Sequence, residues 1–261
     1  MLHGLEGSTS SGYMRGMAKA LQEEYDLVLM NHRSCGPTPN LFLTSYHSGK
    51  TDDVRSLIAH LNEYDSFIVI GFSLGGNIAL KLGGETDLLD KRVTHIAGIS
   101  VPTDLAGSSK TLSQTQNILY LNRFLSQLKR KALNKIKRLG DSSLDVALIK
   151  EAKDLHAFDN AYTAPIHGFA DADDYYTKCS ANAFIGQIKV PTLIVNAHND
   201  TFLSGGCYPH EIVNRNKQVE LICPKFGGHV GFAQNHRMDK PFWSEEVVAS
   251  FLRESKDIRK T

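Results

Sequence analysis

Short apolar runs and amphipathic segments alternate along this chain. The apolar runs are rich in Val, Ile and Leu, which is typical of strands buried in a parallel sheet, whereas apolar residues spaced three to four positions apart predict helices. The predicted strands are Leu27–Met30, Phe67–Ile70, Val93–Ser100, Thr192–Asn196 and Val219–Cys223, and the predicted helices flanking them are Tyr13–Glu24, Thr51–Asn62, Asn77–Leu82 and Ser244–Ser255. This alternation predicts an α/β fold, with a mostly parallel sheet and helices on both of its faces.

The strand signal is absent between Pro102 and Val190. That stretch has a helical pattern instead, with Asn117–Leu139 and Leu144–Leu155 as its longest pieces. An all-helical insertion between two core strands predicts a cap over the strand ends, where open α/β sheets bind ligands. We therefore expect a core formed by residues 1–101 and 191–261, with a helical cap at 102–190.

The first four residues, Met1 to Gly4, have the pattern of a strand end that enters a loop. A domain rarely begins inside one of its own core strands. We therefore expect the N-terminal strands of the sheet to be missing from this chain, which would leave an apolar sheet edge exposed.

Composition adds few constraints. The chain has 261 residues, of which 41 % are hydrophobic and 22 % charged, and its formal net charge is +1, so nothing indicates nucleic-acid binding or disorder. The four cysteines lack metal-site spacing and predict free thiols in a reducing compartment, with no metal or other cofactor. The most apolar window, residues 67–80, is interrupted by polar residues and glycines. It predicts no membrane span, and without a signal-peptide pattern we expect a cytoplasmic location.

The segment with the clearest chemistry is Gly71-Phe-Ser-Leu-Gly75, between a predicted strand and a predicted helix. This is the context of a nucleophile elbow. Gly71 and Gly75 let the chain bend without Cβ clashes, and the bend presents the Ser73 hydroxyl at the positive end of the next helix. The alternative is an ordinary strand–helix turn.

A serine nucleophile needs a histidine base, and the base needs an acid to orient it. Asp200 follows the predicted strand Thr192–Asn196, and His229 follows the predicted strand Val219–Cys223 between glycines and small residues. The chain order Ser, Asp, His is the one that follows a nucleophile elbow of this type. The competing candidates are His198 and the acids of the predicted cap, which we expect to cap helices or join cap to core: Asp159, Asp171, Asp173 and Asp174.

An oxyanion hole requires two backbone N–H groups near the nucleophile. Leu74, directly after Ser73, is expected to supply one, and Leu5 in the loop His3–Gly7 the other. His3 is expected to shape this loop rather than to take part in the chemistry.

Seven cations and no carboxylate lie between Arg123 and Arg138. A solvated helix face opposite an apolar stripe is the first interpretation of this pattern. The alternative is weak contact with an anionic membrane surface.

Motifs along nearly the whole chain resemble those of one family. They are His3–Ser8, Asn31–Gly36, Pro39–Asn40, Tyr46–Gly49, Thr51–Asp53, Gly71–Asn77, Phe158–Asp159, His167–Phe169, Asp174–Tyr176, Pro191–Leu193 and Gly228–Phe232. The chain resembles the YheT/EMB8-like branch of the α/β-hydrolases, which includes ABHD1/2/3-type proteins and yeast medium-chain esterases. The resemblance implies an α/β-hydrolase fold. In one loop the family's usual glycine is replaced by Ser34, which we expect to be tolerated unless residue 34 requires a positive φ.

The resemblance implies a serine carboxylesterase or lipase for short- to medium-chain acyl esters, monoacylglycerols among them. Ser73, Asp200 and His229 would act through an acyl-enzyme that water hydrolyses. Two alternatives stay open. An alcohol could take the acyl group in an acyltransferase reaction, or the chain could be a non-catalytic binding module or an inactive fragment. The sequence leaves the natural acyl and alcohol groups and the oligomeric state open.

Overall fold

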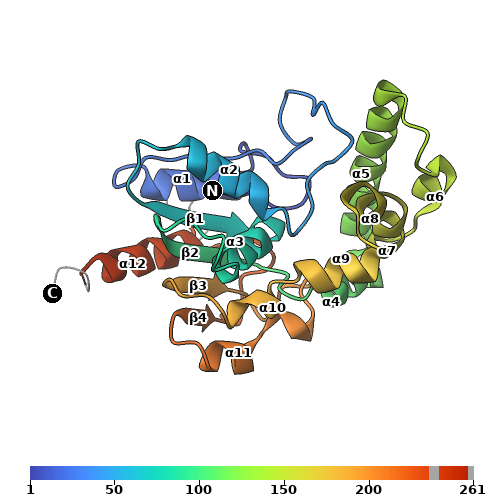
Figure 1. Ribbon diagram of the computed structural model, residues 1–261. Coiled ribbons are helices and arrows are strands. Elements are labelled where there is room, and N and C mark those ends of the chain that lie inside the picture. Colours follow the sequence, from blue (N-terminus) through green and yellow to red (C-terminus); the bar gives the residue numbers. More distant parts are fainter. Residues whose placement is uncertain (235–240, 258–261) are drawn as a thin grey trace.

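The computed structural model describes residues 1–234 and 241–257. Its sheet has four parallel strands in the order β1-β2-β3-β4 (Figure 1). The strands are β1 Phe67–Phe72, β2 Val93–Ile99, β3 Thr192–Val195 and β4 Val219–Ile222. The described helices before β3 are α1 Gly12–Leu21, α2 Thr51–His60, α3 Leu74–Gly84, α4 Leu105–Leu112, η1 Thr115–Asn117, α5 Ile118–Leu139, α6 Val146–Glu151, α7 Leu155–Phe158, η2 Asp159–Thr163, α8 Ala164–His167, α9 Ala172–Cys179 and α10 Asn182–Ile185. Those after β3 are η3 Gly205–Cys207, α11 His210–Asn214 and α12 Trp243–Asp257.

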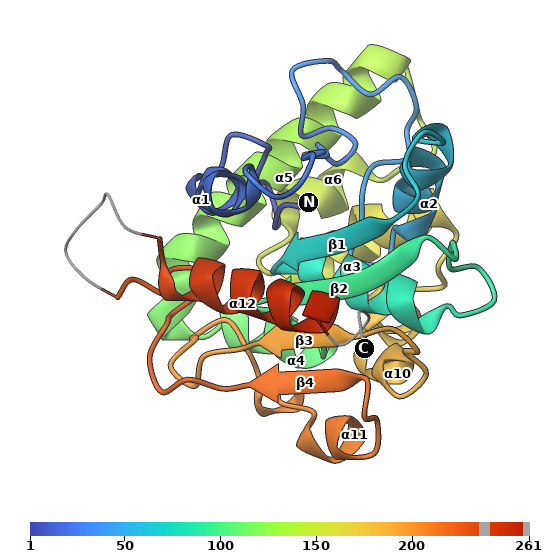
Figure 2. The ribbon, with the colours of Figure 1, turned by 90° about the vertical axis from the view of Figure 1, so that its left-hand side faces the viewer.

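Helices cover both faces of the sheet because successive strand residues point to opposite sides. Val69 of β1 packs into a core with α2 and α3, whereas the next residue, Ile70, packs into a second core with α1 and α12. Figure 2 shows α12 crossing one face, with α3 on the other. The predicted α/β architecture is therefore confirmed.

The sheet edge beside β1 departs from the prediction. Residues 27–30 form no strand, and Met30 makes only an isolated parallel bridge to Leu2. Leu2 in turn bridges Gly71, with its N–H donating to Ile70 O at 2.8 Å. The three residues around Leu2 are too few for a ladder, which explains why the predicted strand is absent. They cover the carboxyl end of β1, where Leu2 is only 2 % exposed, whereas Val28 beside them is 37 % exposed, so the expected apolar edge is covered at Leu2 but not at Val28.

Helices α4–α9, residues 105–179, follow β2 and are called the helical insertion here. Its own apolar cluster includes Leu121, Leu125 and Ile149, and α5 to α8 stand beside the sheet (Figure 1). The helix predicted at Leu144–Leu155 is split, because Asp154 caps α7 by accepting a hydrogen bond from the Ala157 N–H at 2.8 Å. No described helix, α5 included, combines the length and apolar character needed to cross a bilayer.

The loop after Met30 contains a strained residue. Ser34 has a φ of 70°, in the left-handed region, so the exception foreseen for this position applies. Its hydroxyl oxygen is also buried without a hydrogen-bond partner among the described residues. Serine at residue 34 therefore costs stability twice, through its backbone and through its side chain.

Replacing Ser34 by glycine is expected to raise the free energy of unfolding by about 1–2 kcal/mol. Glycine adopts this φ without strain and removes the unsatisfied hydroxyl, although its greater freedom in the unfolded chain offsets part of the gain. Urea unfolding measures the change. Ser34→Ala removes only the hydroxyl and keeps the Cβ, so it should gain less than glycine, and a destabilised glycine variant would contradict this account.

Candidate active site

Ser73 occupies a sharp turn between β1 and α3. Its backbone is strained, with φ 51° and ψ −119°, and its side chain makes no capping hydrogen bond to α3. A Cβ at Gly71 would lie 2.1 Å from Gly75 O, and one at Gly75 would lie 2.5 Å from Leu2 O. Only glycine fits at these two positions, which is the packing that the elbow prediction requires. In this turn the Ser73 hydroxyl points toward the loops that follow β3 and β4.

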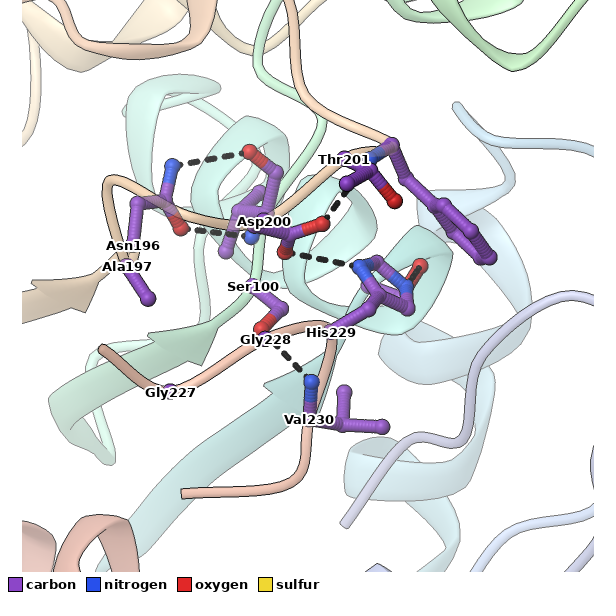
Figure 3. Close-up of polar contacts among 12 residues, drawn as sticks. Ser100, Asn196, Ala197, Asp200, Thr201, Gly227, Gly228, His229 and Val230 are labelled. Atoms are coloured by element: carbon purple, nitrogen blue, oxygen red, sulfur yellow. Dashed lines mark hydrogen bonds and ion pairs between the residues drawn. The ribbon is translucent and has the colours of Figure 1, made fainter. Parts of the chain in front are cut away.

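Three side chains meet at this point (Figure 3). His229 Nε2 lies 2.9 Å from Ser73 Oγ, and His229 Nδ1 lies 2.8 Å from Asp200 Oδ2. The Asp200 side chain is fully buried, and its other oxygen, Oδ1, accepts the Phe202 N–H at 3.0 Å. An ionised carboxylate only accepts hydrogen bonds, so His229 donates from Nδ1 and presents Nε2 as the acceptor toward Ser73. The structure thus brings together the three residues that sequence order selected.

The loop that carries His229 is held on both sides. The N–H groups of the two glycines before His229 both donate to Asn199 Oδ1 at 2.9 Å. The Val230 N–H donates to Ser100 Oγ at 2.9 Å (Figure 3). The Phe202 ring packs against the imidazole, with centroids 4.4 Å apart. These contacts fix the imidazole between acid and serine.

Asn196 fixes the loop that carries Asp200. Its side chain is fully buried at the end of β3, where it accepts the Val101 N–H at 2.7 Å and donates to the Val101 carbonyl at 3.0 Å (Figure 3). It also donates to the Cys207 carbonyl at 2.8 Å. Sequence reasoning missed both Asn196 and Ser100. The signal that could have found them is a polar residue directly after the apolar carboxyl end of a strand, after Ile96–Ile99 for Ser100 and after Leu193–Val195 for Asn196.

The two residues expected to form the oxyanion hole, Leu5 and Leu74, both line the cavity beside Ser73. The loop before Leu5 touches the serine, since a Cβ at Gly4 would lie 3.2 Å from Ser73 Cβ. The Gly4 carbonyl accepts from His3 Nδ1 at 2.7 Å and from the Gly7 N–H at 3.0 Å. In a planar trans peptide the N–H points opposite to the carbonyl, so these two bonds direct the Leu5 N–H away from His3 and Gly7.

His3 is a structural group in this loop. Its Nε2 accepts the His32 N–H at 3.1 Å, which leaves the proton on Nδ1 for the bond to Gly4. Both rings are buried, and burial lowers the pKa of His3 and lowers that of His32 to about 3. Both histidines are therefore neutral at physiological pH. His198, the other competitor, stacks on Tyr208.

A cavity of about 650 Å³ lies over Ser73 and His229, between the loops after the strands and the helical insertion. Its apolar lining from the insertion includes Leu105, Leu112, Phe124, Leu128, Leu155 and Phe158. An apolar cleft with a few polar groups is the usual form of a small-molecule site. The geometry suits an apolar chain placed next to the serine.

One acid of the insertion also lines the cavity. Asp159 accepts hydrogen bonds from the hydroxyls of Tyr176 and Thr163, each at 2.6 Å, and burial raises its pKa to about 6. Asp171 instead caps α9 by accepting from the Asp174 N–H at 2.8 Å. The capping expectation therefore holds for Asp171, whereas Asp159 belongs to the cavity wall.

The basic stretch Arg123–Arg138 is only partly a solvated face. Lys135 is 6 % exposed and donates to Leu43 O, and Lys131 pairs with Glu6 at 2.9 Å. Both lysines line the cavity. Desolvation lowers the pKa of Lys135 to about 8. For Lys135 the solvated-face interpretation is wrong, whereas the Lys131 side chain stays 34 % exposed.

All four cysteines are free thiols. Burial raises the pKa of Cys35 to about 11 and that of Cys179 to about 12, which suppresses their nucleophilic thiolate forms. Across residues 1–234 and 241–257, no group of three or more His, Cys, Asp or Glu side chains is arranged to hold a metal ion.

Comparisons with known proteins place the chain in a family. The alpha/beta hydrolase fold profile matches residues 1–235. The putative esterase YheT of Escherichia coli K12 is 33 % identical over 262 residues, which cover 97 % of this chain and 75 % of YheT. Phospholipase ABHD3 of Bos taurus is 28 % identical over 260 residues, which cover 97 % of this chain but only 62 % of ABHD3.

Solved structures show the same fold. The Pyrococcus furiosus esterase Pf2001 superposes with a TM-score of 0.63 at 19 % identity, covering 97 % of this chain and 79 % of the esterase. The similarity to the curated relatives spans nearly the whole of this chain. The chain therefore belongs to the α/β-hydrolase fold family, among relatives that include esterases and lipases.

Proposed function

We propose that this protein is a serine carboxylesterase or lipase that hydrolyses short- to medium-chain acyl esters. The observation that carries the proposal is the hydrogen-bonded series in which His229 lies 2.9 Å from Ser73 Oγ and 2.8 Å from Asp200 Oδ2. A serine within reach of a base that is itself oriented by a third group is the arrangement that generates a nucleophile. The YheT and ABHD3 relatives, named as a putative esterase and a phospholipase, support an ester as the substrate.

The proposed mechanism is two-step acyl transfer. Ser73 Oγ attacks the ester carbonyl while His229 Nε2 takes its proton, and Asp200 stabilises the resulting imidazolium. The Leu5 and Leu74 amides donate to the tetrahedral oxyanion. The carbon–oxygen bond to the alcohol then breaks, and His229 returns the proton to the leaving oxygen. Water, deprotonated by the same imidazole, hydrolyses the acyl-enzyme.

The helical insertion is proposed to act as a cap that binds the acyl chain. Its apolar side chains supply most of the hydrophobic wall of the cavity, which ends at Ser73 and His229. Burying each methylene of an acyl chain there contributes about 0.8 kcal/mol. A cavity of about 650 Å³ has room for such a chain together with a small alcohol portion.

A series of p-nitrophenyl esters from acetate to palmitate tests the proposal. We expect kcat/KM to rise from acetate to a short- or medium-chain ester and to fall at palmitate, because the cavity limits the length that it can enclose. Ethyl esters among the products, when ethanol is added, would show that an alcohol also takes the acyl group. A chain that unfolds cooperatively but turns over none of these esters would favour a binding module and overturn the proposal.

A further inference from the structure

Asp159, the first residue of η2, places a carboxylate in the wall of a cavity whose lining is mostly apolar. Among residues 1–234 and 241–257 it has no ion-pair partner, and His156, which acts on its pKa, pairs with Asp173 instead at 3.1 Å. A charge removed from water is costly unless it is compensated. A carboxylate at this place is therefore a candidate for binding a ligand.

Two hydroxyl groups hold this carboxylate without neutralising it. Thr163 donates to Asp159 Oδ1 and Tyr176 donates to Oδ2, each at 2.6 Å. Burial raises the pKa of Asp159 to about 6, so the group is mostly ionised at neutral pH and only accepts hydrogen bonds. A carboxylate has about four acceptor positions, of which the two hydroxyls use two. Asp159 keeps partial exposure and lines the cavity, so a ligand there can donate to it.

Hydrogen bonds connect this part of the cavity wall to the nucleophile. Asn77, in the first turn of α3 after Ser73, donates from Nδ2 to Cys179 O at 2.8 Å. Cys179 ends α9, and Tyr176, which holds Asp159, lies three residues earlier, about one helical turn away. Ser73 and Asp159 thus line the same cavity on connected elements. A ligand whose ester group is at Ser73 can reach Asp159 with another of its parts.

The chemistry of an ester decides which of its parts suits Asp159. An acyl chain has no hydrogen-bond donor, and its methylenes would take water from the carboxylate without replacing it. The alcohol portion can carry a hydroxyl or an ammonium group, and both of these donate. Hydrogen bonds to an ionised group are roughly twice as strong as neutral ones, and an ammonium group would also compensate the charge. A donor on the alcohol portion is therefore the group that fits this wall.

We propose that Asp159 is a specificity-determining residue, which binds a hydroxyl or ammonium group on the alcohol portion of the ester. The inference rests on the proposed hydrolase function and names its substrate class, esters of alcohols that carry a second polar group. Thr163 and Tyr176 keep the carboxylate in place. The apolar side chains of the helical insertion are left to the acyl chain.

Two pairs of octanoate esters with matched shapes test the proposal. Ethylene glycol monooctanoate is compared with propyl octanoate, in which a methyl group replaces the hydroxyl. Protonated dimethylaminoethyl octanoate is compared with isopentyl octanoate, in which a CH group replaces the N–H. Each ratio of kcat/KM values is divided by the ratio of the nonenzymatic hydrolysis rates. We expect wild type to prefer the donor in at least one pair by roughly 10–100-fold, the value of a hydrogen bond to a charged group.

Variants of Asp159 assign the preference to its carboxylate. Asp159→Asn removes the charge but keeps an acceptor oxygen, so it should abolish a preference for the ammonium ester and retain part of one for the glycol ester. Asp159→Leu removes every acceptor and should abolish both. Asp171→Asn is the matched control, because Asp171 caps α9 without lining the cavity, and asparagine also caps helices. A merely structural defect would lower kcat/KM for both esters of a pair alike and leave the ratios unchanged.

The outcomes distinguish this inference from the function on which it rests. A preference for the glycol ester alone identifies a hydroxyl as the ligand, and one for the ammonium ester alone identifies an amine. Active wild-type protein that prefers neither donor, or that hydrolyses p-nitrophenyl esters but none of these octanoates, would overturn the specificity role alone, whether or not the variants fold. A preference that survives in folded Asp159→Leu would also overturn it. Wild-type protein that hydrolyses no ester at all would overturn the proposed function as well.

Discussion

Replacing Ser73 by alanine is expected to lower kcat for ester hydrolysis by roughly 10⁶-fold, the loss that follows removal of a nucleophile whose base is left without a reaction partner. The change should leave the fold intact. Alanine keeps the Cβ and the backbone N–H that donates to Ile99 O at 2.8 Å, and it tolerates the strained φ no worse than serine does. What it removes is the oxygen 2.9 Å from His229 Nε2.

A fluorophosphonate probe reports the same change independently of any substrate. Wild-type protein should be labelled covalently, and Ser73→Ala should not. Ser108→Ala is the matched control, because Ser108 also lines the cavity but its Oγ lies 3.1 Å from Cys207 Sγ instead of a base. Labelling that persists in the Ser73 variant would move the nucleophile to another residue.

The sequence predicted the parts of this site that depend on local geometry. Ser73 was found because a strand, a turn with glycines and a helix follow one another within a few residues. Asp200 and His229 were found because each follows a strand, and the carboxyl ends of parallel strands meet at one edge of a sheet. Their separation in the chain did not matter, since the sheet itself brings them together.

Contacts between irregular segments could not be predicted in this way. Glu6 and Lys131, which form an ion pair, come from distant parts of the chain, and no periodicity relates them. The left-handed φ of Ser34 likewise depends on the path of its whole loop. A serine in the sequence gives no sign of a positive φ, as a glycine would.

In the sequence Asp159 resembles the helix-capping acids near it, but in the structure it lines the cavity and accepts hydrogen bonds from Thr163 and from Tyr176 of α9. Residues 27–30 were predicted as a strand from their apolar pattern, but the bridge between Met30 and Leu2 is their one contact of this kind that the structure describes, and the pattern does not reveal it.

Asp200→Asn is expected to lower kcat on the order of 10⁴-fold, and the surroundings of Asp200 explain why asparagine cannot substitute. The carboxylate uses one oxygen for His229 Nδ1 and the other for the Phe202 N–H. Asparagine has a single oxygen. If this oxygen stays on the Phe202 N–H, its NH₂ group faces Nδ1 and holds the imidazole proton on Nε2. His229 then presents a donor to Ser73 and cannot take its proton.

The opposite orientation of the asparagine would retain the correct tautomer, but it would place the NH₂ group against the buried Phe202 N–H, two donors facing each other. Shifting the imidazole proton is the less costly adjustment, so the inactive arrangement should prevail. Asp104→Asn is the control, because an asparagine can still cap α4 at that position. A fall in kcat of less than about tenfold in Asp200→Asn would assign the acid role elsewhere.

Labelling separates the acid from the nucleophile. In Asp200→Asn the Ser73 hydroxyl and the Leu5 and Leu74 amides are unchanged, so the probe should still react, only much more slowly than with wild type. In Ser73→Ala it has no oxygen with which to react. Slow but complete labelling of the asparagine variant, at a stability close to wild type, would therefore show that Asp200 acts through His229 rather than by holding the fold. A variant that unfolds would instead make the buried carboxylate a structural group, and the acid role would lose its support.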